Sequence, residues 1–251
     1  MSVAKFAVAG GLTAIVVGGG TGTFFLYVPA MPNYETIKTP IENKFGQDFQ
    51  KHFVDATENN NSDWWNWSFK YKYYWNPAQS MEFKGLKSGN DLRSKCSAAY
   101  AKATKTEISK DGDSEQEKYE TDVWIYCSIE GFKPITIDKS NSFGDDIYKT
   151  GTNSTKLGGT KKSKLISLND ERNNKFWEIQ EAAFFKGSDD AAGLGAKATE
   201  ASSVFKTLYD KTNRESTDTL KSKCKEKYDG DSNTTSDKET LRFCSLQGKQ
   251  D

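Results

Sequence analysis

Leu92-Arg93-Ser94-Lys95-Cys96 returns later in the chain as Leu220-Lys221-Ser222-Lys223-Cys224. A second motif follows in the same order, because Cys127-Ser128-Ile129-Glu130-Gly131 returns as Cys244-Ser245-Leu246-Gln247-Gly248. Two motifs that recur in the same order indicate an internal duplication. We therefore expect a mainly α protein with two small duplicated modules, at residues 33–131 and 164–251, each with its own pair of cysteines.

Each module is expected to end in an antiparallel helical hairpin. A leucine, a cysteine and a tyrosine lie four residues apart in both modules, which places them on one face of a helix. These residues are Leu92, Cys96 and Tyr100 in one module and Leu220, Cys224 and Tyr228 in the other. A turn rich in aspartate and glycine lies near the midpoint of each cysteine pair. Cysteines equidistant from the turn of a hairpin lie side by side, which predicts the disulfides Cys96–Cys127 and Cys224–Cys244. Four free, buried cysteines are the alternative if the body is cytosolic.

The N-terminal residues 1–32 are expected to hold a membrane anchor. Residues 6–28 are uncharged and follow a single Lys5, and about 20 apolar residues are what a helix needs to cross a bilayer. Val28-Pro29-Ala30 has the small residues of a signal-peptidase site, so a cleaved signal peptide is the alternative. Lys5 before the run and paired cysteines behind it predict a single-pass protein of the cell membrane with an extracellular body.

Small residues recur every four positions in this run, at Gly10, Ala14, Gly18 and Gly22. On a membrane helix they would share one face and allow two helices to approach closely, so self-association is one interpretation. The simpler interpretation is that glycine is common in membrane helices.

The segment from Gly18 to Gly22 also resembles the glycine-rich loops of cell-division GTPases and flavin-binding enzymes. Such a loop must open a helix within a βαβ unit. Pro29 and Pro32 interrupt the stretch where that helix should run, and no alternation of strands and helices follows. These features argue against a nucleotide-binding loop. A membrane-tethered nucleotide-binding protein or enzyme that uses this loop is kept only as the alternative function.

Aromatic residues alternate with mostly polar ones over residues 65–75, which predicts a half-buried strand. The matching stretch of the second module, 176–185, has helical spacing instead, so the two modules disagree. An aromatic row could stack on sugar rings or lie at a membrane interface, although aromatic rows more commonly fill cores. The ligand-binding candidates are Trp65, Trp67, Tyr71, Tyr73 and Trp75.

Charge and composition argue against several functions. The 35 basic and 35 acidic residues cancel, so no basic field attracts nucleic acid. His52 is the single histidine, and the cysteines lack the spacing of zinc or redox motifs. We expect no metal, no cofactor, no catalytic residues and no enzymatic activity, with His52 at the edge of a helix over about 41–56. Residues 132–163 are polar without an apolar period, which predicts a linker.

With the apolar segment, the tryptophan-bearing stretch and the L-[RK]-S-K-C and C-S-[IL]-[EQ]-G pairs, the whole chain resembles the paralogous membrane and surface proteins of haemotropic mycoplasmas. In that family a hydrophobic segment precedes a lysine-rich body with tryptophan-x-x-cysteine elements. Trp124 precedes Cys127 in this way, whereas Arg242 and Phe243 precede Cys244. The resemblance implies a surface protein for host contact or antigenic display, with host cells or antibodies as partners, and it assigns no enzymatic residues.

Overall fold

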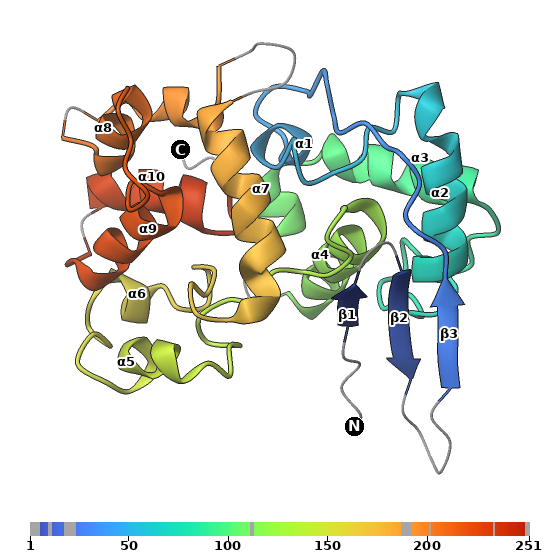
Figure 1. The fold of residues 1–251 in the computed structure, drawn as a ribbon, viewed down its shortest axis with the longest axis horizontal. Coiled ribbons are helices and arrows are strands. Elements are labelled where there is room, and N and C mark those ends of the chain that lie inside the picture. Colours follow the sequence, from blue (N-terminus) through green and yellow to red (C-terminus); the bar gives the residue numbers. More distant parts are fainter. Residues whose placement is uncertain are drawn as a thin grey trace.

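The computed structural model describes residues 6–9, 12–17, 24–110, 113–186, 192–200, 202–232 and 234–248. Its body is mainly helical, as the sequence predicts, and the helices fall into two groups on either side of α7 (Asn174–Phe185) (Figure 1). We refer to the group from α1 to α4 as the first unit and to the group from α5 to α10 as the second.

The first unit is built from short helices and two longer ones. The α-helices are α1 (Phe45–Asp48), α2 (Ser62–Ser68), α3 (Gly89–Tyr100) and α4 (Ser114–Cys127). Between them lie the 3₁₀ turn η1 (Asn59–Asn61) and the π-helical turns η2 (Phe69–Tyr73) and η3 (Thr104–Ile108). The helix expected over 41–56 is only the single turn α1, yet Phe45, Phe49 and Phe53 are all buried.

The second unit repeats four elements of the first in the same order. Its α-helices are α5 (Asp146–Lys149), α6 (Leu157–Thr160), α7, α8 (Val204–Asp210), α9 (Leu220–Asp229) and α10 (Thr234–Cys244). The 3₁₀ turns are η4 (Phe143–Asp145), η5 (Glu171–Asn173) and η6 (Leu194–Lys197). In this unit η5, α7, α9 and α10 correspond in order to η1, α2, α3 and α4 of the first. Apolar side chains from both units form one continuous core.

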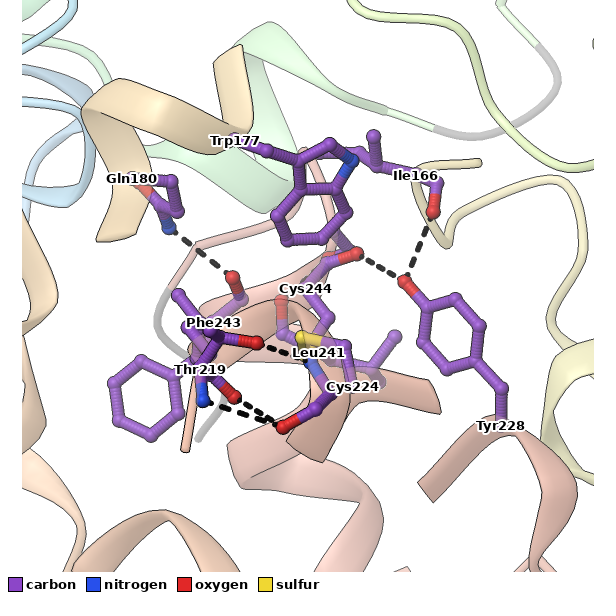
Figure 2. Close-up of a disulfide and its surroundings, with 12 residues drawn as sticks. Ile166, Trp177, Gln180, Thr219, Cys224, Tyr228, Leu241, Phe243 and Cys244 are labelled. Carbon is purple, nitrogen blue, oxygen red and sulfur yellow. Dashed lines mark hydrogen bonds between the residues drawn. A yellow bond between two sulfur atoms is a disulfide. The ribbon is translucent and has the colours of Figure 1, made fainter. Parts of the chain in front are cut away.

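Both disulfides pair as predicted. Cys96 and Cys127 join α3 to α4 with Cα atoms 5.7 Å apart, and Cys224 and Cys244 join α9 to α10 with Cα atoms 5.9 Å apart. Figure 2 shows the second bond between its two helices. The stripe of leucine, cysteine and tyrosine is buried in both helices, so the helical spacing identified the core-facing residues correctly.

The duplication extends to the hydrogen bonds that close each unit. The Tyr100 hydroxyl donates to the carbonyl oxygen of Val54 (2.9 Å), and the Tyr228 hydroxyl donates to that of Ile166 (3.0 Å). Each tyrosine also reaches the carbonyl oxygen of the second cysteine of its own unit, and Figure 2 shows this bond for Tyr228. The two units therefore share one hydrogen-bonding frame as well as one sequence motif.

The expected strand over 65–75 is wrong. These residues continue α2 into η2, and the equivalent α7 is helical as predicted, so the two units agree. The alternation misled because this helix is aromatic on more than one side. Trp64 and Trp65 are fully buried, whereas Tyr74 and Trp75 are exposed.

Residues 132–163, expected to be a linker, carry α5 and α6 and pack into the second unit. Ile137, Tyr148 and Leu157 are buried there. The backbone N–H of Ile137 donates to the carbonyl oxygen of Leu165 (2.9 Å), as that of Ile37 does to Phe53 in the first unit (3.1 Å). Helices of one turn show no apolar period, which is why the sequence indicated a solvated connector.

The apolar N-terminal run has a different structure from the expected helix. Its described residues form three antiparallel strands, β1 (Phe6–Ala9), β2 (Leu12–Val17) and β3 (Phe24–Val28), in the order β1-β2-β3. Ala14 opposes Ala7 and Tyr27, while Gly10, Gly18 and Gly22 lie outside the described residues. β-branched and aromatic residues such as Ile15, Val16 and Phe25 favour strands. The strands extend away from the helical body (Figure 1).

Among the helices of the described residues, none combines the length and the apolar character that crossing a membrane requires.

Candidate functional site

A cleft lies between the two units. Its volume is about 820 Å³, and residues of both units line it. One wall is a face of α4, whose residues recur every three or four positions, as one side of a helix requires. These residues are Ser114, Glu117, Glu120, Thr121 and Ile125.

The opposite wall of the cleft comes from the second unit. It consists of the chain from Phe132 to Lys139, together with Ser163 and Lys164, and Leu246 and Gln247 close the end. Phe132, Pro134 and Ile135 add apolar surface between the polar groups. A concave surface with apolar patches and a few polar groups is the usual form of a binding site.

The two walls of the cleft carry opposite charge. Asp113, Glu117 and Glu120 lie on the α4 side, whereas Lys133, Lys139 and Lys164 lie on the other, with Lys110 and Asp138 as exceptions. An acidic wall opposite a basic wall suits an extended segment that carries both charges, such as a polar peptide.

An ion pair joins the walls at the floor of the cleft. The Lys133 ammonium lies 2.6 Å from Glu120 Oε2, and both side chains are largely buried. The Ser109 hydroxyl lies 2.5 Å from Glu120 Oε1 and 2.9 Å from the carbonyl oxygen of Leu246. Glu120 therefore ties α4 to the second unit, and we assign it to the architecture of the cleft.

The surroundings of Lys164, in the basic wall of the cleft, lower the pKa of its side chain. Burial lowers the pKa of its ammonium, and the nearby positive charge of Lys105 lowers it further. An anionic group bound beside Lys164 would relieve this repulsion.

His52 lies at a second junction between the units, away from solvent. Its Nδ1 contacts Glu130 Oε1, its Nε2 lies 2.8 Å from Gln180 Oε1, and the side chains of His52 and Glu130 are fully buried. The ring stacks on Phe176 with centroids 4.7 Å apart. The expected position of His52 at the edge of a helix is therefore wrong, because its side chain is fully buried. The adjacent cavity of about 20 Å³ has room for about one water molecule and for no larger ligand, so this group is a structural junction.

Lys72 is enclosed beside this junction. Its ammonium donates to the carbonyl oxygen of Ser128 (2.5 Å) and lies over the rings of Trp64 and Trp67, 4.8 and 5.6 Å from their centroids. Burial lowers the pKa of Lys72 to about 7, although the Glu130 carboxylate opposes the shift. The contacts with the carbonyl oxygen and the two indole rings favour the charged form of the amine and hold it in place.

The structure divides the five aromatic candidates between core and surface. Trp65 is buried, and the Tyr73 hydroxyl donates to the carbonyl oxygen of Phe83 (2.7 Å), so both belong to the core. Trp67 and Tyr71 are half-buried and pack together with ring centroids 6.0 Å apart. Trp75 is 46% exposed and packs against Tyr74, which is 71% exposed.

No protein family, curated protein or solved structure matches this chain. Within the described ranges, no three histidine, cysteine, aspartate or glutamate side chains come close enough to hold a metal ion. The cleft is therefore interpreted from its own geometry.

Sequence reasoning missed the cleft although part of its signal was present. The polar face of α4 is visible in the spacing of Glu117, Thr121 and Ile125, but it resembles an ordinary solvated helix face. The opposite wall comes from residues 132–139, which were assigned to the linker. A site shared by two duplicated units becomes visible only when their packing is known.

Proposed function

We propose that this protein is a single-pass surface protein, anchored through its N-terminal segment, whose disulfide-bonded units face outside the cell and contact host cells or antibodies. The observation that carries the proposal is that all four cysteines form two bonds, one at the same place in each unit. Disulfides form and persist in oxidising surroundings, which favours an extracellular body.

Two further features support this topology. Residues 6–28 contain no charged side chain, and the body begins directly after them. The resemblance to surface proteins of haemotropic mycoplasmas supports host contact or antigenic display. Self-association through the N-terminal segment and nucleotide binding by Gly18 to Gly22 stay predictions, because most of these residues lie outside those described.

The cleft between the units is the surface that we propose for contact with a partner. Its opposed acidic and basic walls suit a polar peptide segment of a surface protein. The ion pair between Lys133 and Glu120 holds the walls at a defined separation, so the cleft is present before a partner binds.

The topology is tested by treating intact cells with protease. We expect degradation of the body without permeabilisation, and no alkylation of cysteine thiols until a reductant is added. A body that survives until the membrane is opened would contradict the proposal, as would four thiols that react without reduction.

The cleft is tested with Thr121→Trp, which places a large ring on the α4 wall. We expect binding of the protein to host cells to weaken about tenfold or more, which corresponds to ~1.4 kcal/mol. Lys238→Trp is the matched control, because Lys238 lies as far before Cys244 as Thr121 lies before Cys127, and it is exposed. Equal binding by both variants would refute the cleft as the contact surface.

A further inference from the structure

The helix formed by α2 and η2 carries an aromatic face that no other part of the described chain covers fully. We define the aromatic face as Trp67, Lys70, Tyr71, Tyr74 and Trp75. Trp67 and Tyr71 pack together with ring centroids 6.0 Å apart, and Tyr74 and Trp75 lie in the turn directly after Tyr73, the last residue of η2. Trp64, Trp65 and Ser68 of α2 are buried in the core, and the Trp64 ring packs against that of Trp67 with centroids 6.3 Å apart. Tyr74 and Trp75 together give the face two exposed rings.

The corresponding helix of the second unit, α7, is buried at two positions that match residues of the aromatic face. Asn61 and Asn173 correspond, as do Ser68 and Gln180, which donate to the carbonyl oxygens of Tyr126 (2.7 Å) and Phe243 (3.1 Å). In the same register, Trp67 corresponds to Ile179 and Tyr71 to Ala183, both of which are buried. At these two positions one helix packs aliphatic residues inside the protein, whereas its duplicate carries larger aromatic rings that are only half-buried.

The N-terminal segment meets the body at this aromatic face. The indole N–H of Trp67 donates to the carbonyl oxygen of Pro29 (3.0 Å), the residue that follows the last residue of β3. In Figure 1, β3 runs up to the lower end of α2. The uncharged run of residues 6–28 therefore enters the body beside Trp67.

The side chains of the face suit the boundary between lipid and water. Tryptophan and tyrosine concentrate there because each combines an apolar ring with a polar group. The ammonium of Lys70 lies over the Tyr71 ring, 5.2 Å from its centroid. A lysine in this position covers apolar surface with its stem and extends its charge towards headgroups.

We propose that the aromatic face rests on the bilayer surface beside the point where the N-terminal segment enters it. This proposal depends on the anchored topology proposed above. It gives the body a fixed orientation, with the first unit against the membrane. The residues that sequence analysis considered as ligand-binding then split into core residues and a lipid-facing set.

The test uses the full chain in phosphatidylcholine vesicles, with tryptophan fluorescence quenched by brominated lipid. Trp64, Trp65, Trp124 and Trp177 are buried, so the quenched signal is expected to come from Trp75 with a smaller part from Trp67. We expect Trp75→Phe to lose most of the quenching. The substitution retains an aromatic ring at an exposed position, so the fold is preserved.

Phe143→Trp is the matched control, because Phe143 is 88% exposed and lies in the second unit. Its added tryptophan is expected to escape quenching. Equal quenching in Trp75→Phe and the unaltered chain, or a larger quenched intensity in Phe143→Trp than in the unaltered chain, would overturn the proposal. Flotation of the vesicles separates the two hypotheses: protein that floats without quenching refutes the aromatic face alone, and protein that does not float refutes the anchor as well.

Discussion

Asn173 occupies in the second unit the position that Asn61 occupies in the first. The Asn61 side chain accepts the backbone N–H of Glu35 (2.8 Å) and donates to the carbonyl oxygens of Glu35 and Asp55 (2.9 and 2.8 Å). Asn173 makes the same three bonds with Ile135 and Ser167. Each asparagine thus joins the first residues of its unit to the segment that precedes α2 or α7.

Replacing this asparagine is expected to destabilise the protein strongly. Asn61→Ala leaves an N–H and two carbonyl oxygens without their partner, at a cost of roughly 3 kcal/mol in the free energy of unfolding. Urea unfolding followed by tryptophan fluorescence measures the loss. Asn60→Ala is the control, because Asn60 is exposed, and its effect should stay within about 0.5 kcal/mol. Similar midpoints for the two variants would show that the bonds contribute little.

Loss of either disulfide is expected to weaken the whole body. The bonds close loops of 31 and 20 residues, so Cys127→Ser and Cys244→Ser should each lower the free energy of unfolding by about 3 to 4 kcal/mol. Because one continuous core joins the units, we expect a single unfolding transition in both variants. Two separate transitions, seen by comparing near-ultraviolet circular dichroism with fluorescence, would indicate independent units.

The disulfide pairing could be predicted because it depends on local spacing. In each unit a cysteine lies on the apolar stripe of its helix and a turn lies near the midpoint of the cysteine pair, which leaves few possible pairings. Because both units show the same spacing, the pairing in one unit supports the pairing in the other. The strand over 65–75 could not be excluded in this way. Trp65 and Trp75 share a sequence period, but one enters the core and the other stays exposed, and only the packing around them decides this.

The junctions between the units could not be predicted from sequence. His52 contacts Glu130 and Gln180, which lie 78 and 128 residues away, and no motif connects them. The wall of the cleft formed by residues 132–139 has the composition of a loop. Both features depend on how two duplicated units pack, whereas the repeat indicates only that there are two.

The buried pair of His52 and Glu130 is expected to tolerate joint replacement better than the loss of one partner. His52→Ala leaves the Glu130 carboxylate buried without its partner, which typically costs about 3 to 5 kcal/mol. The double variant His52→Phe with Glu130→Leu removes both polar groups and keeps an aromatic ring against Phe176. We expect its free energy of unfolding to exceed that of His52→Ala. A double variant that is less stable than His52→Ala would show that the polar junction itself is required.

Lys72 is expected to make stability depend on pH. Its pKa of about 7 in the folded chain lies below the ordinary lysine value of 10.5, so between pH 7 and pH 10 the unfolded chain binds more protons at this site. Stability should therefore rise with pH across this range, by up to about 1.4 kcal/mol per pH unit. Near pH 10 the rise should end, because burial raises the pKa of Tyr100 and Tyr228 well above 10, so that both ionise only on unfolding.

Lys72→Met should flatten this pH dependence, because the methionine side chain does not titrate. Lys70→Met is the matched control, since Lys70 is exposed two residues earlier on the same helix, and it should keep the slope of the unaltered chain. Urea unfolding at pH 7, 8 and 9 gives the three slopes. If Lys72→Met retains the rise in stability, the enclosed ammonium beside Trp64 and Trp67 is not its source, and the low pKa assigned to Lys72 is refuted.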